Sequence, residues 1–276
     1  MTTTPGLDRS PWLRAQVPAW NVPFAPFTIA GNVHFVGASG VSAFLITTSE
    51  GHILLDGGLA ETVPQITVNI ATLGFRIRDV RYLLNSHAHF DHSGGLAALK
   101  AASGARMIAS QGDRSVLESG HIEFGPASEV DTAPVSVDRV IADGHLIVLG
   151  SVTLTALITP GHTRGCTSYA LVTRATDGML RRVFFHCSST VSGHRLVPES
   201  YPGMVADYRR TFDRLSRERA DIFLANHPDF FQMKEKRARQ LAGDANAFVD
   251  TQALGAFNRE MRQAFERELA RQKTNP

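Results

Sequence analysis

Residues 81–92 read Arg-Tyr-Leu-Leu-Asn-Ser-His-Ala-His-Phe-Asp-His, an apolar strand pattern followed by four potential metal ligands. Side chains two residues apart in an extended chain point the same way, so His87 and His89 can bind one ion. Asp91 and His92 follow where a Gly-rich turn leads into a predicted helix, and this turn can present them to a second ion. Burying these groups together without a metal or full hydrogen bonding would be unfavourable. We therefore interpret the stretch as a metal site rather than as surface histidines.

Two further histidines stand at the ends of predicted strands. His162 lies in Thr-Pro-Gly-His-Thr after the strand predicted at 152–158, and His227 follows the strand predicted at 222–225. Catalytic zinc sites need at least three protein ligands each, so these two positions complete what the motif lacks. The other histidines lack this context. We interpret His186 as ambiguous and predict surface or loop positions for the rest, namely His34, His52, His121, His145 and His194.

Strand and helix patterns alternate along both halves of the chain. Strands are expected at 33–36, 42–47, 53–56, 79–85, 107–109, 139–141, 146–148, 152–158, 166–173, 182–187 and 222–225, and helices at 63–73, 95–102, 112–119, 201–218, 233–241 and 244–271. Residues 121–137 lack periodicity and are predicted to form an irregular loop. The pattern indicates an α/β fold in which two packed, mixed β-sheets are covered by helices, a four-layer αββα sandwich. We expect a single domain over 28–276 and a Pro-rich irregular leader over 1–27.

The composition excludes several classes of protein. The formal net charge is +2, 43% of residues are hydrophobic and 20% are charged. The basic residues are scattered, which argues against a nucleic-acid partner. No apolar stretch approaches the roughly 20 residues that span a bilayer, so no membrane partner is expected. We expect a monomer, periplasmic if a signal peptide was removed and otherwise cytoplasmic.

Cys166 and Cys187 are the only cysteines. They flank a predicted hairpin that turns at 175–178, and counted from this turn they lie almost opposite each other. Both a disulfide and a pair of buried free thiols fit this placement.

The combined motifs resemble the metallo-β-lactamase superfamily. His-X-His-X-Asp-His, then Pro-Gly-His-Thr, then Asn-His-Pro occur in this order from Ala30 onward, and Asp56-Gly57-Gly58 matches the family's Asp-Gly-Gly. The resemblance implies two zinc ions. It assigns His87, His89 and His162 to the first ion and Asp91, His92 and His227 to the second.

The absence of a carboxylate from one strand narrows the resemblance to a subclass of this family. Glyoxalase II-like enzymes, lactonases and the nuclease branch bridge the metals with an aspartate from a strand in the second half, but residues 182–190 contain no carboxylate. A serine at Ser188 with all six ligands intact resembles the subclass B3 β-lactamases. Subclass B1 would use a cysteine as a ligand, and Cys187 lies one position from Ser188. The presence of His92 favours B3.

This resemblance implies a zinc-dependent β-lactamase that opens penicillins, cephalosporins and carbapenems through a hydroxide held by the two zinc ions. Asp91 and His89 are the implied catalytic residues. Ser188 and Thr190 are candidates for binding the substrate carboxylate, although an ordinary turn role suits them as well. The resemblance also suggests that Trp20 and the loop 121–137 roof the site.

Three alternatives follow from the same motifs. The first is a hydrolase of the same fold that acts on lactones, thioesters or other esters. The second is a di-iron oxidoreductase, although such proteins carry Glu where Ala88 stands and add a flavin domain that is not found here. The third is a metal-free binding protein.

Overall fold

The computed structural model describes residues 11–175 and 177–274 and contains two β-sheets. The first sheet has seven strands in the order β1-β2-β3-β4-β5-β6-β7. Its strands are β1 (Phe27–Ala30), β2 (Val33–Phe35), β3 (Phe44–Thr48), β4 (Gly51–Leu55), β5 (Val80–Leu84), β6 (Arg106–Ser110) and β7 (Arg139–Ile141). Pairing is antiparallel from β1 to β4 and parallel from β4 to β7. This sheet is therefore mixed.

The second sheet has five strands in the order β12-β11-β10-β9-β8. These are β8 (Leu146–Leu149), β9 (Val152–Ile158), β10 (Thr167–Arg174), β11 (Leu180–His186) and β12 (Ile222–Ala225). Only the β11–β12 pair is parallel. The strand that ends at His186 and the strand that ends at Ala225 thus finish at the same edge of the sheet.

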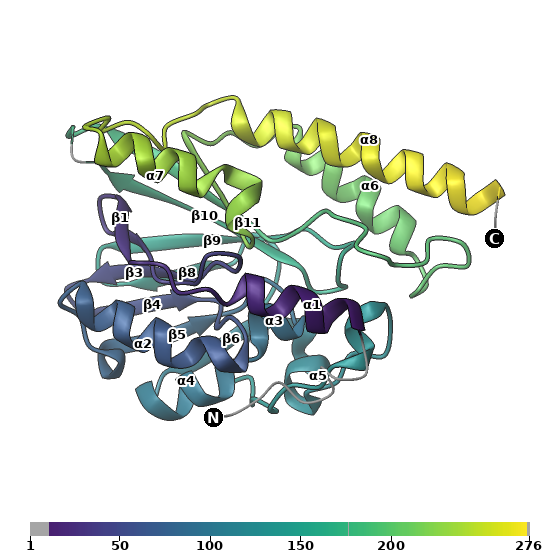
Figure 1. The fold of residues 1–276 in the computed structure, drawn as a ribbon, viewed down its shortest axis with the longest axis horizontal. Coiled ribbons are helices and arrows are strands. Elements are labelled where there is room, and N and C mark those ends of the chain that lie inside the picture. The colour runs from purple at the N-terminus through teal and green to yellow at the C-terminus, as the bar shows by residue number, and fades with distance from the viewer. Residues whose placement is uncertain (1–10, 176, 275–276) are drawn as a thin grey trace.

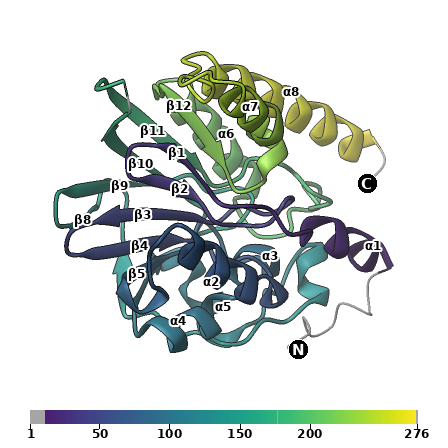
Figure 2. The ribbon, with the colours of Figure 1, turned by 60° about the vertical axis from the view of Figure 1, so that its left-hand side comes forward.

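Helices cover the outer face of each sheet (Figures 1 and 2). On the first sheet lie α2 (Val63–Thr72), α3 (Phe90–Ser93), α4 (Leu96–Ser103) and α5 (Gln111–Ser119); on the second lie α6 (Met204–Leu215), α7 (Met233–Leu241) and α8 (Ala253–Thr274). Short 3-10 turns occur at 60–62, 77–79, 126–129 and 228–231. The predicted αββα sandwich with two mixed sheets is confirmed.

The inner faces of both sheets form one apolar core. Phe44 on β3 contacts the ring of Phe185 on β11 at a centroid distance of 5.2 Å, and both side chains are buried. Each such aromatic side chain removes a large apolar area from water, which is the main favourable term in folding. The packing brings the ends of strands from both halves of the chain to one edge of the sandwich.

The N-terminal segment is more regular than predicted. Residues 11–20 form helix α1 (Pro11–Trp20), with Pro11 at its first position, where the missing N–H leaves no hydrogen bond unmade. Strand β1 was also not predicted; it pairs antiparallel with β2. The prediction of an irregular leader is therefore wrong for residues 11–20, and its residues 1–10 lie outside the described residues.

The bounds of the other predicted elements differ from the observed ones by at most two residues, with two exceptions. The helix predicted from Tyr201 begins at Met204, after Gly203 at a φ of 88°. The helix predicted from Asp244 begins at Ala253, and turns precede it. Within residues 11–175 and 177–274, no helix combines the length and the apolar character needed to cross a bilayer.

Candidate metal centre

Three histidines gather at the edge where both sheets end. His87 and His89 follow β5 through extended backbone, so their rings point to the same side, as predicted. His162 follows β9 and comes from the second sheet. The ring centroids are 4.7 Å apart for His87–His89, 4.7 Å for His87–His162 and 4.6 Å for His89–His162. One nitrogen from each lies within 4.8 Å of the others, which suits a single ion.

A second group lies beside the first. Asp91 and His92 stand in the short helix α3 and share a compact group with His87. Asp91 Oδ2 is 3.2 Å from His92 Nε2 and 3.4 Å from Nε2 of His227, which follows β12. The structure thus brings together all six residues that the sequence nominated, drawn from both sheets.

Asp56 contacts the turn that carries His87 and His92. This residue directly follows β4, has a φ of 66° and is 1% exposed. Its Oδ1 accepts a hydrogen bond from the backbone N–H of Ser86 at 2.6 Å, and its Oδ2 lies 3.8 Å from His92 Nδ1. This buried carboxyl group therefore holds the backbone of the turn at Ser86 and lies close to the ring of His92.

The outer nitrogens of two histidines are fixed by backbone carbonyls. His162 Nδ1 is 2.9 Å from the carbonyl oxygen of Thr190, and His227 Nδ1 is 2.8 Å from that of Gly40. A carbonyl only accepts, so each Nδ1 carries the proton and each Nε2 keeps a free lone pair. This is the tautomer that a metal ligand requires.

The remaining donor atoms also fit a bound metal. Nε2 of His87 and Nε2 of His89 are buried and have no hydrogen-bond partner in the described part of the chain. Burial, reinforced by neighbouring imidazoles, lowers the pKa of His89 to about 3 and that of His162 well below its usual value, so both rings are neutral. Burial alone would raise the pKa of Asp91, but His92 and His227 outweigh it and lower this pKa. The neutral imidazoles of His89 and His162 and the ionised carboxylate of Asp91 are donor groups of the kinds that zinc binds.

A cavity of about 300 Å³ opens onto these groups. It is lined by Trp20, Gly40, His89, Phe90, Asp91, Pro126, Ala127, His162, Ser188, Thr190, Ser192, His194, His227, Asp229 and Phe230. Trp20 on α1 packs 5.6 Å from the ring of His227, so the N-terminal helix forms part of the wall. Pro126 and Ala127 belong to the predicted loop 121–137, so this loop forms part of the wall as well.

The two candidate substrate-binding residues face this cavity. The Ser188 hydroxyl lies 3.2 Å from that of Thr190, which lies 2.7 Å from that of Ser192. Three hydroxyls therefore line one wall beside His162.

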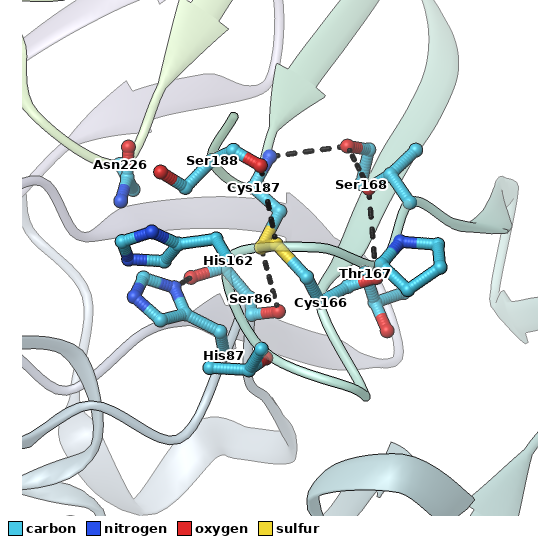
Figure 3. Close-up of a disulfide and its surroundings, with 12 residues drawn as sticks. Ser86, His87, His162, Cys166, Thr167, Ser168, Cys187, Ser188 and Asn226 are labelled. Atoms are coloured by element: carbon cyan, nitrogen blue, oxygen red, sulfur yellow. Dashed lines mark hydrogen bonds between the residues drawn. A yellow bond between two sulfur atoms is a disulfide. The ribbon is translucent and has the colours of Figure 1, made fainter. Parts of the chain in front are cut away.

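The adjoining cysteines form a disulfide, which settles the open alternative (Figure 3). It joins Cys166, just after the His162 turn, to Cys187, just before Ser188. Cys187 Sγ also lies 3.1 Å from the carbonyl oxygen of Ser86, next to His87. The cross-link therefore lies next to the turn that carries His162 and next to the segment that carries His87. Thr176 of the predicted hairpin turn lies outside the described residues.

Two histidine predictions are wrong. His34 and His52 are 6% and 7% exposed rather than on the surface, because strand pairing places them against Phe75. His194 lies in a loop, as predicted, but its place at the site was missed: it is 1% exposed and lines the cavity, with its ring 5.5 Å from that of His162. No spacing signal near His194 distinguishes it in the sequence. The ambiguous His186 is buried outside the cavity and contacts Ser189.

Proteins with known structures share this fold, and a family model matches half of the chain. A model of the metallo-beta-lactamase superfamily matches residues 36–173. The subclass B3 metallo-beta-lactamase BJP-1 of Bradyrhizobium japonicum is similar at a TM-score of 0.88 and 36% identity, over 93% of this chain and 97% of that one. FEZ-1 from Legionella gormanii is similar at 0.89 and 36%, over 92% and 98%. A Cronobacter sakazakii metallo-beta-lactamase described by a HARLDQ motif is similar at 0.88 and 42%, over 94% and 99%.

Curated relatives match a shorter segment. A probable metallo-hydrolase of Burkholderia pseudomallei is 34% identical over 39% of this chain, and a hydroxyacylglutathione hydrolase of Rhodospirillum rubrum is 30% identical over 42%. The chain spans only about a third of the length of these two relatives, 35% and 36%.

The fold, the histidine-rich site and the matched family model together define a hydrolase of the metallo-β-lactamase type. The chain belongs to the metallo-beta-lactamase superfamily. The three structures compared above, which resemble the chain over more than nine-tenths of its length, are metallo-beta-lactamases, and BJP-1 is of subclass B3.

Proposed function

We propose that this protein is a zinc-dependent β-lactamase that holds two zinc ions and opens the β-lactam ring of penicillins, cephalosporins and carbapenems. The main support is the extent of the similarity to lactamase structures. It covers more than nine-tenths of both chains for BJP-1 and FEZ-1, whereas the hydrolase relatives match little more than a third of their own length. The region that forms the second half of the site is thus shared with the lactamases.

The donor set divides naturally between two ions. His87, His89 and His162 would hold one, and Asp91, His92 and His227 would hold the other. Bound zinc supplies Lewis acidity that polarises a carbonyl and lowers the pKa of water. The Asp91 carboxylate faces this region in its ionised form, and we assign it the role of accepting a hydrogen bond from the attacking water.

The cavity wall suits a small carboxylate-bearing amide. None of the described residues that line it is Lys or Arg, so neutral donors, among them the hydroxyls of Ser188 and Thr190, would bind a substrate carboxylate. Trp20 and Phe230 supply apolar surface for ring substituents. The end of β11 supplies serine where a bridging carboxylate would stand in the thioesterase branch, which favours the lactamase over that branch.

A thioesterase is the second candidate, because curated relatives are named hydroxyacylglutathione hydrolases. A substrate panel separates the two. The purified chain, loaded with zinc and assayed for zinc content, is offered nitrocefin, a penicillin, a carbapenem, a lactone and a glutathione thioester. We expect turnover of the β-lactams and loss of that turnover in Asp91→Ala. Rapid thioester hydrolysis without β-lactam opening would overturn the proposal.

The disulfide bears on the compartment. Disulfides persist in oxidising environments and are rare in the bacterial cytoplasm. We therefore propose that the protein acts in the periplasm, where a β-lactamase meets its substrate. Cell fractionation that placed the native protein in the cytoplasm would contradict this.

A further inference from the structure

Asp113 is a buried carboxylate that contacts both metal-ligand segments of the first site. It is the third residue of α5 and is 2% exposed. Its Oδ2 accepts hydrogen bonds from the backbone N–H of Ala88 at 3.0 Å and the hydroxyl of Thr163 at 3.1 Å, and its Oδ1 accepts one from the backbone N–H of Gly165 at 3.0 Å. Ala88 stands between His87 and His89, and Thr163 follows His162.

Two glycines allow this contact by bringing backbones together. A Cβ at Gly112 would lie 2.7 Å from the carbonyl carbon of Arg164, and a Cβ at Gly165 would lie 2.3 Å from the backbone nitrogen of Asp113. Any side chain there would push α5 away from the turn that carries His162. The close approach is therefore built into the sequence around Asp113, and the Ser110 hydroxyl reinforces it by donating to the Gly165 carbonyl at 2.6 Å.

Only a carboxylate matches the groups that surround this side chain. Ala88 and Gly165 each present a backbone N–H, one to each oxygen of Asp113. An ionised carboxylate accepts on both oxygens, whereas an amide must turn its NH₂ group toward one of the two N–H donors. Asparagine has nearly the same shape, but in either orientation its NH₂ group would face one of the two backbone N–H groups. That N–H group would lose its hydrogen-bond acceptor.

We propose that Asp113 is a positioning residue for the first metal site. It fixes the spacing between the His87–His89 pair from the first sheet and His162 from the second. In the described part of the chain, no hydrogen bond of Asp113 reaches Asp91, His92 or His227. At the second site, the Gly40 carbonyl instead accepts from His227 Nδ1, and Asp56 Oδ2 lies 3.8 Å from His92 Nδ1. This inference rests on the metal sites of the proposed function but not on its substrate.

The experiment measures zinc affinity at each site separately. His227→Ala leaves only the first site complete and His89→Ala only the second, so Asp113→Asn is placed in each of these two backgrounds. Zinc affinity is measured by competition with a chelator of known affinity. We expect zinc binding about 10- to 100-fold weaker in the His227→Ala background, and unchanged binding in the His89→Ala background. A carboxylate with a merely structural role would weaken both or neither, and either result would overturn the proposal.

Two further variants guard against a general loss of folding. Thr163→Val removes one of the three donors and leaves both backbone contacts, so we expect about 2- to 10-fold weaker zinc binding in the first-site background. Asp138→Asn is the matched control, because Asp138 also accepts from a backbone N–H, that of Met107 at 2.7 Å, but far from the ligands in the fold. It should lower thermal stability without changing either zinc affinity. If Asp113→Asn does not fold, unchanged zinc binding in Thr163→Val overturns the proposal.

The same measurements distinguish this inference from the proposed function. A chain that binds zinc as described but opens no β-lactam overturns the proposed function alone. Wild-type protein that binds no zinc overturns both.

Discussion

Two groups of buried histidines occupy the first sheet and its edge, and they differ in what their nitrogens contact. At the metal centre, the Nε2 atoms of His87 and His89 are buried and without a hydrogen-bond partner among the described residues. On the outer face of the sheet, His34 contacts the hydroxyls of Thr28 at 3.0 Å and Thr47 at 3.2 Å. Both nitrogens of His34 are therefore satisfied within the protein.

The neighbouring His52 sharpens the contrast. Its ring lies 4.9 Å from that of Phe75, and its Nδ1 lacks a partner in the described part of the chain. Among the described residues, however, no carboxylate and no third imidazole forms a ligand group with it, and it does not line the cavity at the candidate metal centre. Burial of an imidazole is thus a poor indicator of metal binding. The informative feature is several unpaired nitrogens that converge beside a carboxylate and a cavity.

Removing one histidine from each group should have very different effects. His89→Ala deletes a ligand, so we expect β-lactam turnover to fall by more than about 100-fold and bound zinc to decrease. His34→Gln keeps hydrogen-bonding capacity between Thr28 and Thr47 and should leave zinc content and turnover unchanged. Steady-state kinetics and metal analysis on the same samples test both. Similar losses in the two variants would contradict the distinction drawn between the groups.

Of the two regions compared, the disulfide lies beside the candidate metal centre and not beside His34 and His52. It closes a loop with a sequence separation of 21 residues, so its removal should lower the free energy of unfolding by about 3 kcal/mol. We expect the Cys166→Ala/Cys187→Ala double variant to show this loss in urea denaturation of zinc-free protein. Wild type treated with a reductant should lose a similar amount, and the double variant should not respond to the reductant. An unchanged midpoint in the double variant would show that the cross-link adds nothing to stability.

Protonation of His34, on the outer face of the sheet, should make the stability of the protein depend on pH. Burial, followed by the charge of His52, lowers the pKa of His34 to about 4, whereas its ordinary value is 6.5. Between these values the unfolded chain binds the proton first, so the stability that His34 contributes is lost as the pH falls from about 6.5 toward 4. His34→Gln should decline less steeply over this window than wild type in urea denaturation of zinc-free protein. The exposed His145→Gln should follow wild type, and equal slopes in all three would contradict this account.

Much of the site could be predicted because its ligands stand at strand ends with strong local signals. The motif at 87–92 and the Pro-Gly-His and His-Pro turns each follow an apolar run, and the structure brings all six side chains together. The parallel pairing of β11 and β12 explains why His227 arrives at the same edge.

The features that escaped prediction depend on contacts distant in sequence. Strand β1 is only four residues long and exists because it pairs with β2. His34 is buried because Phe75, far along the chain, packs against it. Asp113 lies in an ordinary amphipathic helix, and only the approach of Gly165 reveals its contacts. None of these leaves a periodic pattern in the chain.

Gly40 connects the N-terminal helix to His227, and this connection bears on the design of inhibitors. Its N–H donates to the carbonyl of Trp20 at 3.0 Å, and its own carbonyl holds His227 Nδ1 at 2.8 Å. A Cβ at this position would lie 2.5 Å from the Cα of Trp20, so the helix and the support of His227 are joined through a single residue. A compound that inserts beneath Trp20 would strain the same residue that sets the orientation of His227. Such a compound would compete with substrate and loosen a metal ligand at once, without chelating the metal itself.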